Sequence, residues 1–161
     1  MSYQTPRLER VRDNVIRIHH PDVLVGPVSQ LTNPVSASAT ALTVRNNEGF
    51  ADDDLILIED RGSSLAEVTD LTAAPSAGTS LTATAIIFGH PIGTSVRKIL
   101  FDRAEISGAA TPTGSKTVIA TIDLRFSNDA TDYIVSATTY AYYFVRYNNS
   151  NTSAFGEYSD A

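Results

Sequence analysis

The sequence predicts an all-β protein, and three observations lead to this class. Between residues 41 and 100, short runs of apolar and β-branched residues alternate with clusters of turn residues. Thr, Ser, Ala and Asn are abundant while Lys and Glu are scarce, which favours strands and turns over helices. Apolar residues make up 42% of the 161 residues, which is enough to build a buried core.

Residues 1–34 are predicted to form an extended N-terminal arm. Apolar residues at 8, 11, 15 and 18 fit a helix, but the β-branched residues of 14–19 favour a strand there. Prolines at 21, 27 and 34 exclude a helix over the segment that follows. Such an arm buries little of itself, so it is either disordered or packed on a neighbouring subunit. The predicted subunit-interface residues are Arg7, Arg10, Arg12, Val15, Ile16, Ile18, Val23, Leu24 and Val25.

Residues 35–100 are predicted to form a small β-barrel or sandwich. Strands are expected at about 41–45, 55–60, 64–71, 80–84 and 95–101, separated by turns at 46–49, 61–62 and 75–78. The run from Leu55 to Ile58 is apolar at every position, so both faces of this strand should be covered. Five short strands fit an architecture in which closure removes exposed sheet edges.

Residues 101–161 are predicted to form a second β domain. Phe101 and Ile106 anchor its first strand, and residues 117–126 form a long strand with Val118, Ala120, Ile122 and Leu124 on one face. A tyrosine-rich strand over 140–147 follows, then a polar turn over 148–153 and a last strand over 154–159.

Composition and charge exclude several classes of function. Cysteine is absent, which removes disulfides, thiol catalysis and zinc–thiolate sites. The net charge is −6, and the acidic excess lies after residue 34, which argues against nucleic-acid binding. No signal peptide and no membrane-length apolar run are recognisable, so we expect a soluble protein with no membrane partner.

No catalytic or metal constellation can be assembled from the sequence. Asp52, Asp53 and Asp54 lack the spacing of a calcium loop and fit a solvated turn better. His19 and His20 are neighbours on a strand and point to opposite faces, while His90 precedes a proline in a turn. Neither a nucleophile elbow nor a phosphate-binding glycine loop is present. We therefore expect a protein that is not an enzyme and that has no cofactor and no metal.

The tyrosine-rich strand is the strongest candidate for a binding surface. Tyr140 and Tyr142 share one face of a strand, and Tyr143 and Tyr147 share the other. One face must pack in the core, so the other is predicted to be a subunit interface or a platform on which sugars stack.

Two stretches resemble known structural modules. Residues 43–58 (TVRNNEGFADDDLILI), 65–69 (LAEVT) and 89–96 (GHPIGTSV) resemble a small β module of tailed-bacteriophage structural proteins. Residues 142–160 (YYFVRYNNSNTSAFGEYSD) are similar to the last hairpin of fibronectin type III and Ig-like sandwiches. The second region is shorter than the ~100 residues usual for such sandwiches and has no Trp. It is therefore either partial or completed by residues of the arm.

These resemblances imply a non-enzymatic structural component of a tailed-phage virion. Capsid decoration, the neck and the tail surface are all open positions. The expected partners are other virion proteins, such as major capsid, neck or tail proteins, together with copies of the chain in a homo-oligomer. The alternative is an adhesin module that binds a host surface or a polysaccharide through its tyrosines.

Overall fold

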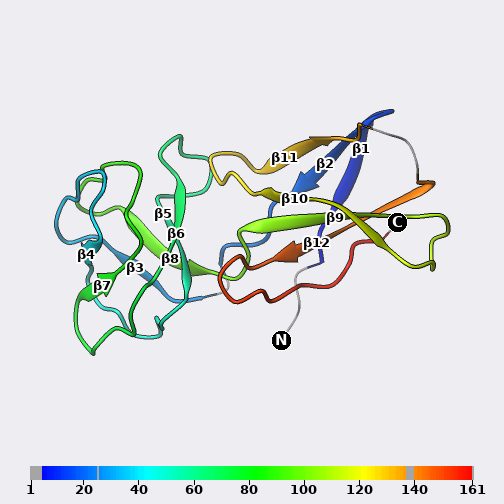
Figure 1. The fold of residues 1–161 in the computed structure, drawn as a ribbon. Coiled ribbons are helices and arrows are strands. Elements are labelled where there is room, and N and C mark those ends of the chain that lie inside the picture. Colours follow the sequence, from blue (N-terminus) through cyan, green and yellow to red (C-terminus); the bar gives the residue numbers. More distant parts are fainter. Residues whose placement is uncertain (1–4, 25, 137–139, 161) are drawn as a thin grey trace. The chain divides into compact units, whose positions relative to one another are not determined.

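The computed structural model describes residues 5–24, 26–136 and 140–160, and this part of the chain is all-β (Figure 1). It contains twelve strands and no helix, which confirms the predicted fold class. The chain divides into two compact units. Unit 1 comprises residues 1–22, 101–125 and 129–161, and unit 2 comprises residues 23–100 and 126–128.

Unit 2 contains a four-stranded antiparallel sheet and a two-stranded one. The larger sheet has the order β3 (Val28–Gln30), β8 (Ser95–Ile99), β5 (Leu55–Ile58) and β6 (Glu67–Asp70). The smaller sheet pairs β4 (Ala41–Thr43) with β7 (Ser80–Thr82). All four residues of β5 are buried, as predicted, because this central strand has a neighbour on each side and is covered on both faces.

Single bridges join the two sheets of unit 2 at both edges. Leu31 pairs with Val44, and Leu71 pairs with Ala83. The sheets enclose one apolar core, formed by Leu31, Leu42, Val44, Phe50, Ile56, Ile58, Leu71, Leu81, Ala83, Ile86 and Val96. No sheet closes on itself in the described part of the chain, so unit 2 is of the sandwich type and not a closed barrel.

Unit 1 consists of two three-stranded antiparallel sheets. One sheet has the order β1 (Leu8–Arg12), β2 (Val15–His19) and β11 (Ala130–Ile134). The other has the order β10 (Thr117–Asp123), β9 (Arg103–Ala109) and β12 (Tyr142–Asn148). The two sheets lie on opposite sides of this unit in Figure 1. Ile18, Ile106 and Val145 are among the side chains buried in unit 1.

The strand β10 departs from the predicted alternation. Its register with β9 shifts between Val118 and Ala120, so these two residues pair with the consecutive residues Ser107 and Ile106. Consecutive residues of a strand point to opposite faces, so Val118 and Ala120 do not share one face. The side chain of Val118 is accordingly 53% exposed.

The structure pairs the strands of residues 1–34 within the same chain, whereas the sequence predicted an extended arm that is disordered or packed on a neighbouring subunit. Residues 8–19 form the hairpin β1–β2, and β2 pairs with β11 along its length. Residues 28–30 form β3, which pairs with β8 in unit 2. The β-branched residues of this region therefore complete two sheets of the same chain, and unit 1 gains two strands that residues 101–161 alone do not provide.

Candidate functional site

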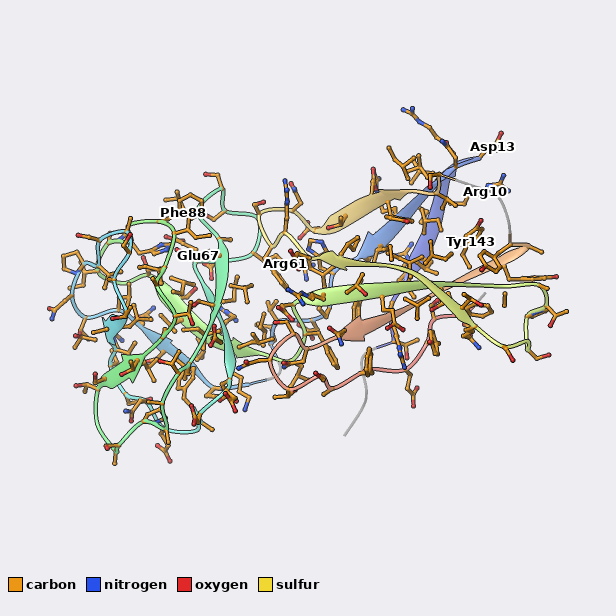
Figure 2. All side chains as sticks on the ribbon, in the orientation of Figure 1. Arg10, Asp13, Arg61, Glu67, Phe88 and Tyr143 are labelled. Atoms are coloured by element: carbon orange, nitrogen blue, oxygen red, sulfur yellow. The ribbon has the colours of Figure 1, made fainter. Side chains whose placement is uncertain are left out.

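The turn of the β1–β2 hairpin places charged side chains at one end of unit 1. Asp13 and Asn14 form a two-residue turn, a position that both residue types favour. The guanidinium of Arg10 donates to the Asp13 carboxylate at 2.8 Å, and both side chains are exposed. Figure 2 shows Arg10 and Asp13 at the end of the hairpin, with Tyr143 at the start of β12 beneath them.

A glycine provides the place for one of the tyrosines. A Cβ atom on Gly108 of β9 would overlap the ring of Tyr140, so the ring lies directly on the glycine backbone. The Tyr140 ring also meets the Tyr143 ring edge to face, with centroids 6.4 Å apart and planes at 84°. This is a preferred geometry for aromatic pairs, and it holds both rings in defined positions.

These side chains line a groove of about 480 Å³ that lies wholly within unit 1. We call it the unit-1 groove. Its half-buried or buried apolar lining comes from Leu8, Val15, Ile16 and Val135. Tyr140, Ala141, Tyr142 and Tyr143 line it from the start of β12, and Glu9, Arg10, Arg12, Asp13 and Asn14 give it an exposed polar rim. The volume lies within the roughly 300–1,000 Å³ typical of small-ligand sites.

The groove unites two sets of residues that the sequence analysis treated separately. From the predicted arm it takes Arg10, Arg12, Val15 and Ile16; from the tyrosine strand it takes Tyr140, Tyr142 and Tyr143. Arg7, Val23 and Leu24 do not line it. Val25 lies outside the described residues.

Two predicted site residues are core residues of unit 1. Ile18 is fully buried, and Tyr147 is only 2% exposed. The Tyr147 hydroxyl donates to the backbone oxygen of His19 at 2.6 Å, and its ring stacks on Phe101 with centroids 5.8 Å apart. Neither side chain is accessible to a neighbouring subunit or a sugar, because each fills the space between the two sheets.

The outer face of β12 is covered by the same chain. Phe144 meets Tyr158 edge to face, and the Lys116 ammonium lies 4.4 Å from the Phe144 ring centroid. The Arg146 guanidinium lies 3.7 Å from the Phe155 ring centroid and donates to Glu105 at 2.7 Å. Cation–π contacts of this kind occupy the faces of Phe144 and Phe155, so this side of the strand offers no open platform at residues 144–146, and only Tyr142 at its start remains exposed.

Beside the groove, an ion pair joins β2 to β11. The Arg17 guanidinium donates two hydrogen bonds to the Asp132 carboxylate, at 2.7 and 2.9 Å. The hydrogen bond from Arg17 lowers the pKa of Asp132 below its ordinary value, and the same bond raises the pKa of Arg17. Both groups are therefore charged at neutral pH, and the pair ties the middle strand of this sheet to its edge.

Unit 2 presents an exposed apolar segment, residues 86–92, which we call the apolar loop. Ile86 is buried in the core, whereas Ile87 and Ile92 are 69% and 65% exposed and Phe88 is half-buried. A backbone bridge between Val35 and His90, with hydrogen bonds of 2.9 Å in both directions, fixes the middle of the loop.

A buried carboxylate holds the apolar loop from below. Glu67 of β6 accepts hydrogen bonds from the backbone N–H groups of Ile87 at 2.6 Å and Phe88 at 3.0 Å. It also lies 2.8 Å from Nε2 of His90, whose side chain is fully buried. Figure 2 shows Glu67 beneath Phe88. Glu67 was not singled out by the sequence, because a single Glu in an alternating strand normally faces water.

The structure supports the turn interpretation for the acidic cluster. Asp54 accepts the backbone N–H of Ala51 at 2.8 Å and pairs with Lys98 at 2.6 Å. Asp53 adopts a left-handed φ of 62°, as turn residues do. In the described ranges, no three His, Cys, Asp or Glu side chains gather so that they could hold a metal ion.

Comparisons with known proteins give no assignment. Neither the protein-family models nor the curated proteins contain a match to this chain. The described residues contain no helix that is long and apolar enough to cross a membrane.

Proposed function

We propose that this chain is a non-enzymatic structural component of a tailed-phage virion that assembles through contacts made by its β units. Capsid decoration, the neck and the tail surface remain the candidate positions. The resemblance of residues 43–58, 65–69 and 89–96 to a virion β module supports this role. The acidic net charge of −6 suits a position away from packaged DNA.

The apolar loop is the observation that carries the proposal. Two large aliphatic side chains, Ile87 and Ile92, project from a segment whose backbone is fixed by Glu67 and by the bridge to Val35. Exposed apolar side chains on a rigid support are typical of contact surfaces, since little conformational entropy is lost when they bind. Residues 89–92 of the loop, which include Ile92, also belong to a stretch that carries the resemblance.

Virion assembly needs a repeated contact between subunits, and the apolar loop provides a surface for it. Ile87 and Ile92 would be covered by a neighbouring copy or by a capsid, neck or tail protein. The N-terminal residues act in this scheme as parts of unit 1 and unit 2, and not as a free strap, because β1, β2 and β3 complete sheets of their own chain.

Two measurements test the proposal. Mass spectrometry of tailed-phage particles purified from the strain that encodes the chain should detect it at a fixed copy number per particle. Light scattering should show that the purified chain either self-associates with rising concentration or adds mass to particles that lack it. Absence of the chain from purified particles would overturn the proposal.

A variant pair separates the apolar loop from other surfaces. Ile87→Ser combined with Ile92→Ser should abolish the association while both units stay folded. Val118→Ser is the matched control, since Val118 is an exposed aliphatic residue of an edge strand in unit 1. Truncation of residues 1–34 is a poor test, because it removes β1, β2 and β3 together.

A further inference from the structure

We propose that the unit-1 groove is a binding site for a neutral oligosaccharide. This inference does not depend on where in a virion the chain lies. It concerns a different surface from the apolar loop, so either proposal can fail alone.

The tyrosines supply the faces on which sugar rings stack. Tyr142 is 36% exposed, and Tyr140 and Tyr143 are half-buried, so part of each residue is accessible from the groove. The contact with Gly108 and the edge-to-face contact fix the Tyr140–Tyr143 pair. Rings that are already in place lose little entropy when a ligand arrives, which favours binding of a weakly interacting molecule.

The polar rim supplies hydrogen-bonding groups of both kinds. Arg10 and Arg12 are donors, Glu9 and Asp13 are acceptors, and Asn14 is both. Each hydroxyl of a sugar donates one hydrogen bond and accepts others, so a rim with mixed groups matches a polyol. Two cations and two anions on the rim give no net charge, and this balance favours a neutral ligand.

Other ligand classes fit the groove less well. Nucleic acid and phosphorylated ligands need an excess of basic side chains, whereas the carboxylates of Glu9 and Asp13 lie on the same rim as the arginines. A lipid chain or a purely apolar protein segment in the groove would cover the charged groups of the rim without offering them hydrogen-bond partners. Removing those groups from water in this way costs free energy. Of these classes, an oligosaccharide offers both an apolar C–H face for the tyrosines and hydroxyls for the rim.

Saturation-transfer NMR on the full chain tests the site. Maltotriose, cellotriose and chitotriose are the first probes, followed by an array of neutral bacterial-surface oligosaccharides at millimolar concentration. Tyr142→Ala should weaken binding of the best ligand roughly tenfold, whereas Tyr142→Phe should keep it within about twofold, because the aromatic face remains. Phe155→Ala is the matched control, an aromatic residue of the same unit outside the groove that is 40% exposed; it should not change the affinity.

Each outcome decides the proposal. Binding that weakens in Tyr142→Ala and not in Phe155→Ala supports it, provided that amide hydrogen exchange shows unit 1 folded in both variants. Failure of every neutral oligosaccharide to bind would overturn it. Equal affinities of wild type and Tyr142→Ala for the oligosaccharide would also overturn it. So would a change in the mass of the assembled chain caused by Tyr142→Ala alone, because the groove would then hold a protein segment.

Discussion

Replacing Glu67 by Gln should destabilise unit 2 by about 2–4 kcal/mol, because its buried carboxylate accepts two backbone N–H groups and lies 2.8 Å from Nε2 of His90. One oxygen accepts the backbone N–H of Ile87, and the other accepts the N–H of Phe88 and faces Nε2 of His90. The Gln side chain keeps one oxygen and turns an NH₂ group toward donors. At least one of the two backbone N–H groups then loses its acceptor, and the new NH₂ faces a donor in place of an acceptor.

The magnitude follows from counting those groups. Each buried polar group left without a partner costs about 1–3 kcal/mol, so two of them cost roughly 2–6 kcal/mol. The lower part of this range applies, because residues 87 and 88 lie beside exposed surface and can move toward water. Glu67→Ala removes every acceptor at once and should cost about 3–5 kcal/mol.

Native-state hydrogen exchange is the appropriate assay. The chain has no Trp and divides into two compact units, so a single spectroscopic melting curve would not report unit 2 alone. Exchange at the β5 and β8 amides reports the free energy of unfolding of unit 2, and exchange at residues 87 and 88 reports local opening of the apolar loop.

Glu59→Gln is the control for the Glu67 prediction. The Glu59 carboxylate lies 3.7 Å from Nδ1 of His90, beyond hydrogen-bond distance, and is more exposed than that of Glu67. This variant should cost less than about 1 kcal/mol. A change of less than about 0.5 kcal/mol in Glu67→Gln, or equal losses in the two variants, would refute the assignment of Glu67 as the support of the loop.

Three further predictions concern unit 1. Gly108→Ala should displace the Tyr140 ring and cost about 1–3 kcal/mol, seen as loss of the ring-current shifts of that tyrosine; unchanged shifts would contradict the contact. Asp132→Asn should weaken the loss of stability of unit 1 at low pH. Arg17 lowers the pKa of Asp132, so the stabilisation by this pair is fully present above the ordinary pKa of 3.8 and is lost as the pH falls through the lower pKa of the folded state. An equally steep fall in the free energy of unfolding at low pH in wild type and variant would contradict this. Tyr147→Phe removes the hydrogen bond between the sheets and should cost about 1–2 kcal/mol in a urea titration followed by exchange, with no change in unit 2.

The strands of unit 2 were predictable because local signals and packing agree there. The five runs expected between 41 and 101 correspond to β4, β5, β6, β7 and β8, each ending slightly earlier than the pattern indicated. Gly49 and Gly62 adopt positive φ values of 84° and 93° in the expected turns. A fully apolar run such as β5 indicates by itself that both faces of the strand are buried, so the prediction did not require the neighbouring strands to be known.

The N-terminal strands were harder to place because no feature of the local sequence identifies the strands with which they pair. The Asp13–Asn14 turn between Arg12 and Val15 is a hairpin signal, but the apolar spacing of residues 8–18 also fits a helix. The partner of β2 is β11, more than one hundred residues later in the chain. Pairing over such a separation leaves no periodic trace in a single sequence.

The candidate site was predictable in its residue types and not in its position. Tyr142 and Tyr143 attracted attention as aromatic residues of a strand, yet Tyr147 of the same strand is a core residue. Which tyrosine remains accessible depends on what covers each face of β12. On one face this is the segment with Phe155 and Tyr158, and on the other it is the sheet that contains β2.

By itself, the sequence determined the β class, the strands with apolar or β-branched runs, the turns, and the lack of cysteine chemistry. These properties depend on the dihedral preferences and side-chain periodicity of short segments, which every residue carries with it. Only the tertiary structure decided that the first strands complete two sheets, that the unit-1 groove joins arginines with tyrosines, and that Glu67 lies beneath the apolar loop. Those features depend on long-range pairing and on the burial of particular atoms, and both are properties of the folded chain.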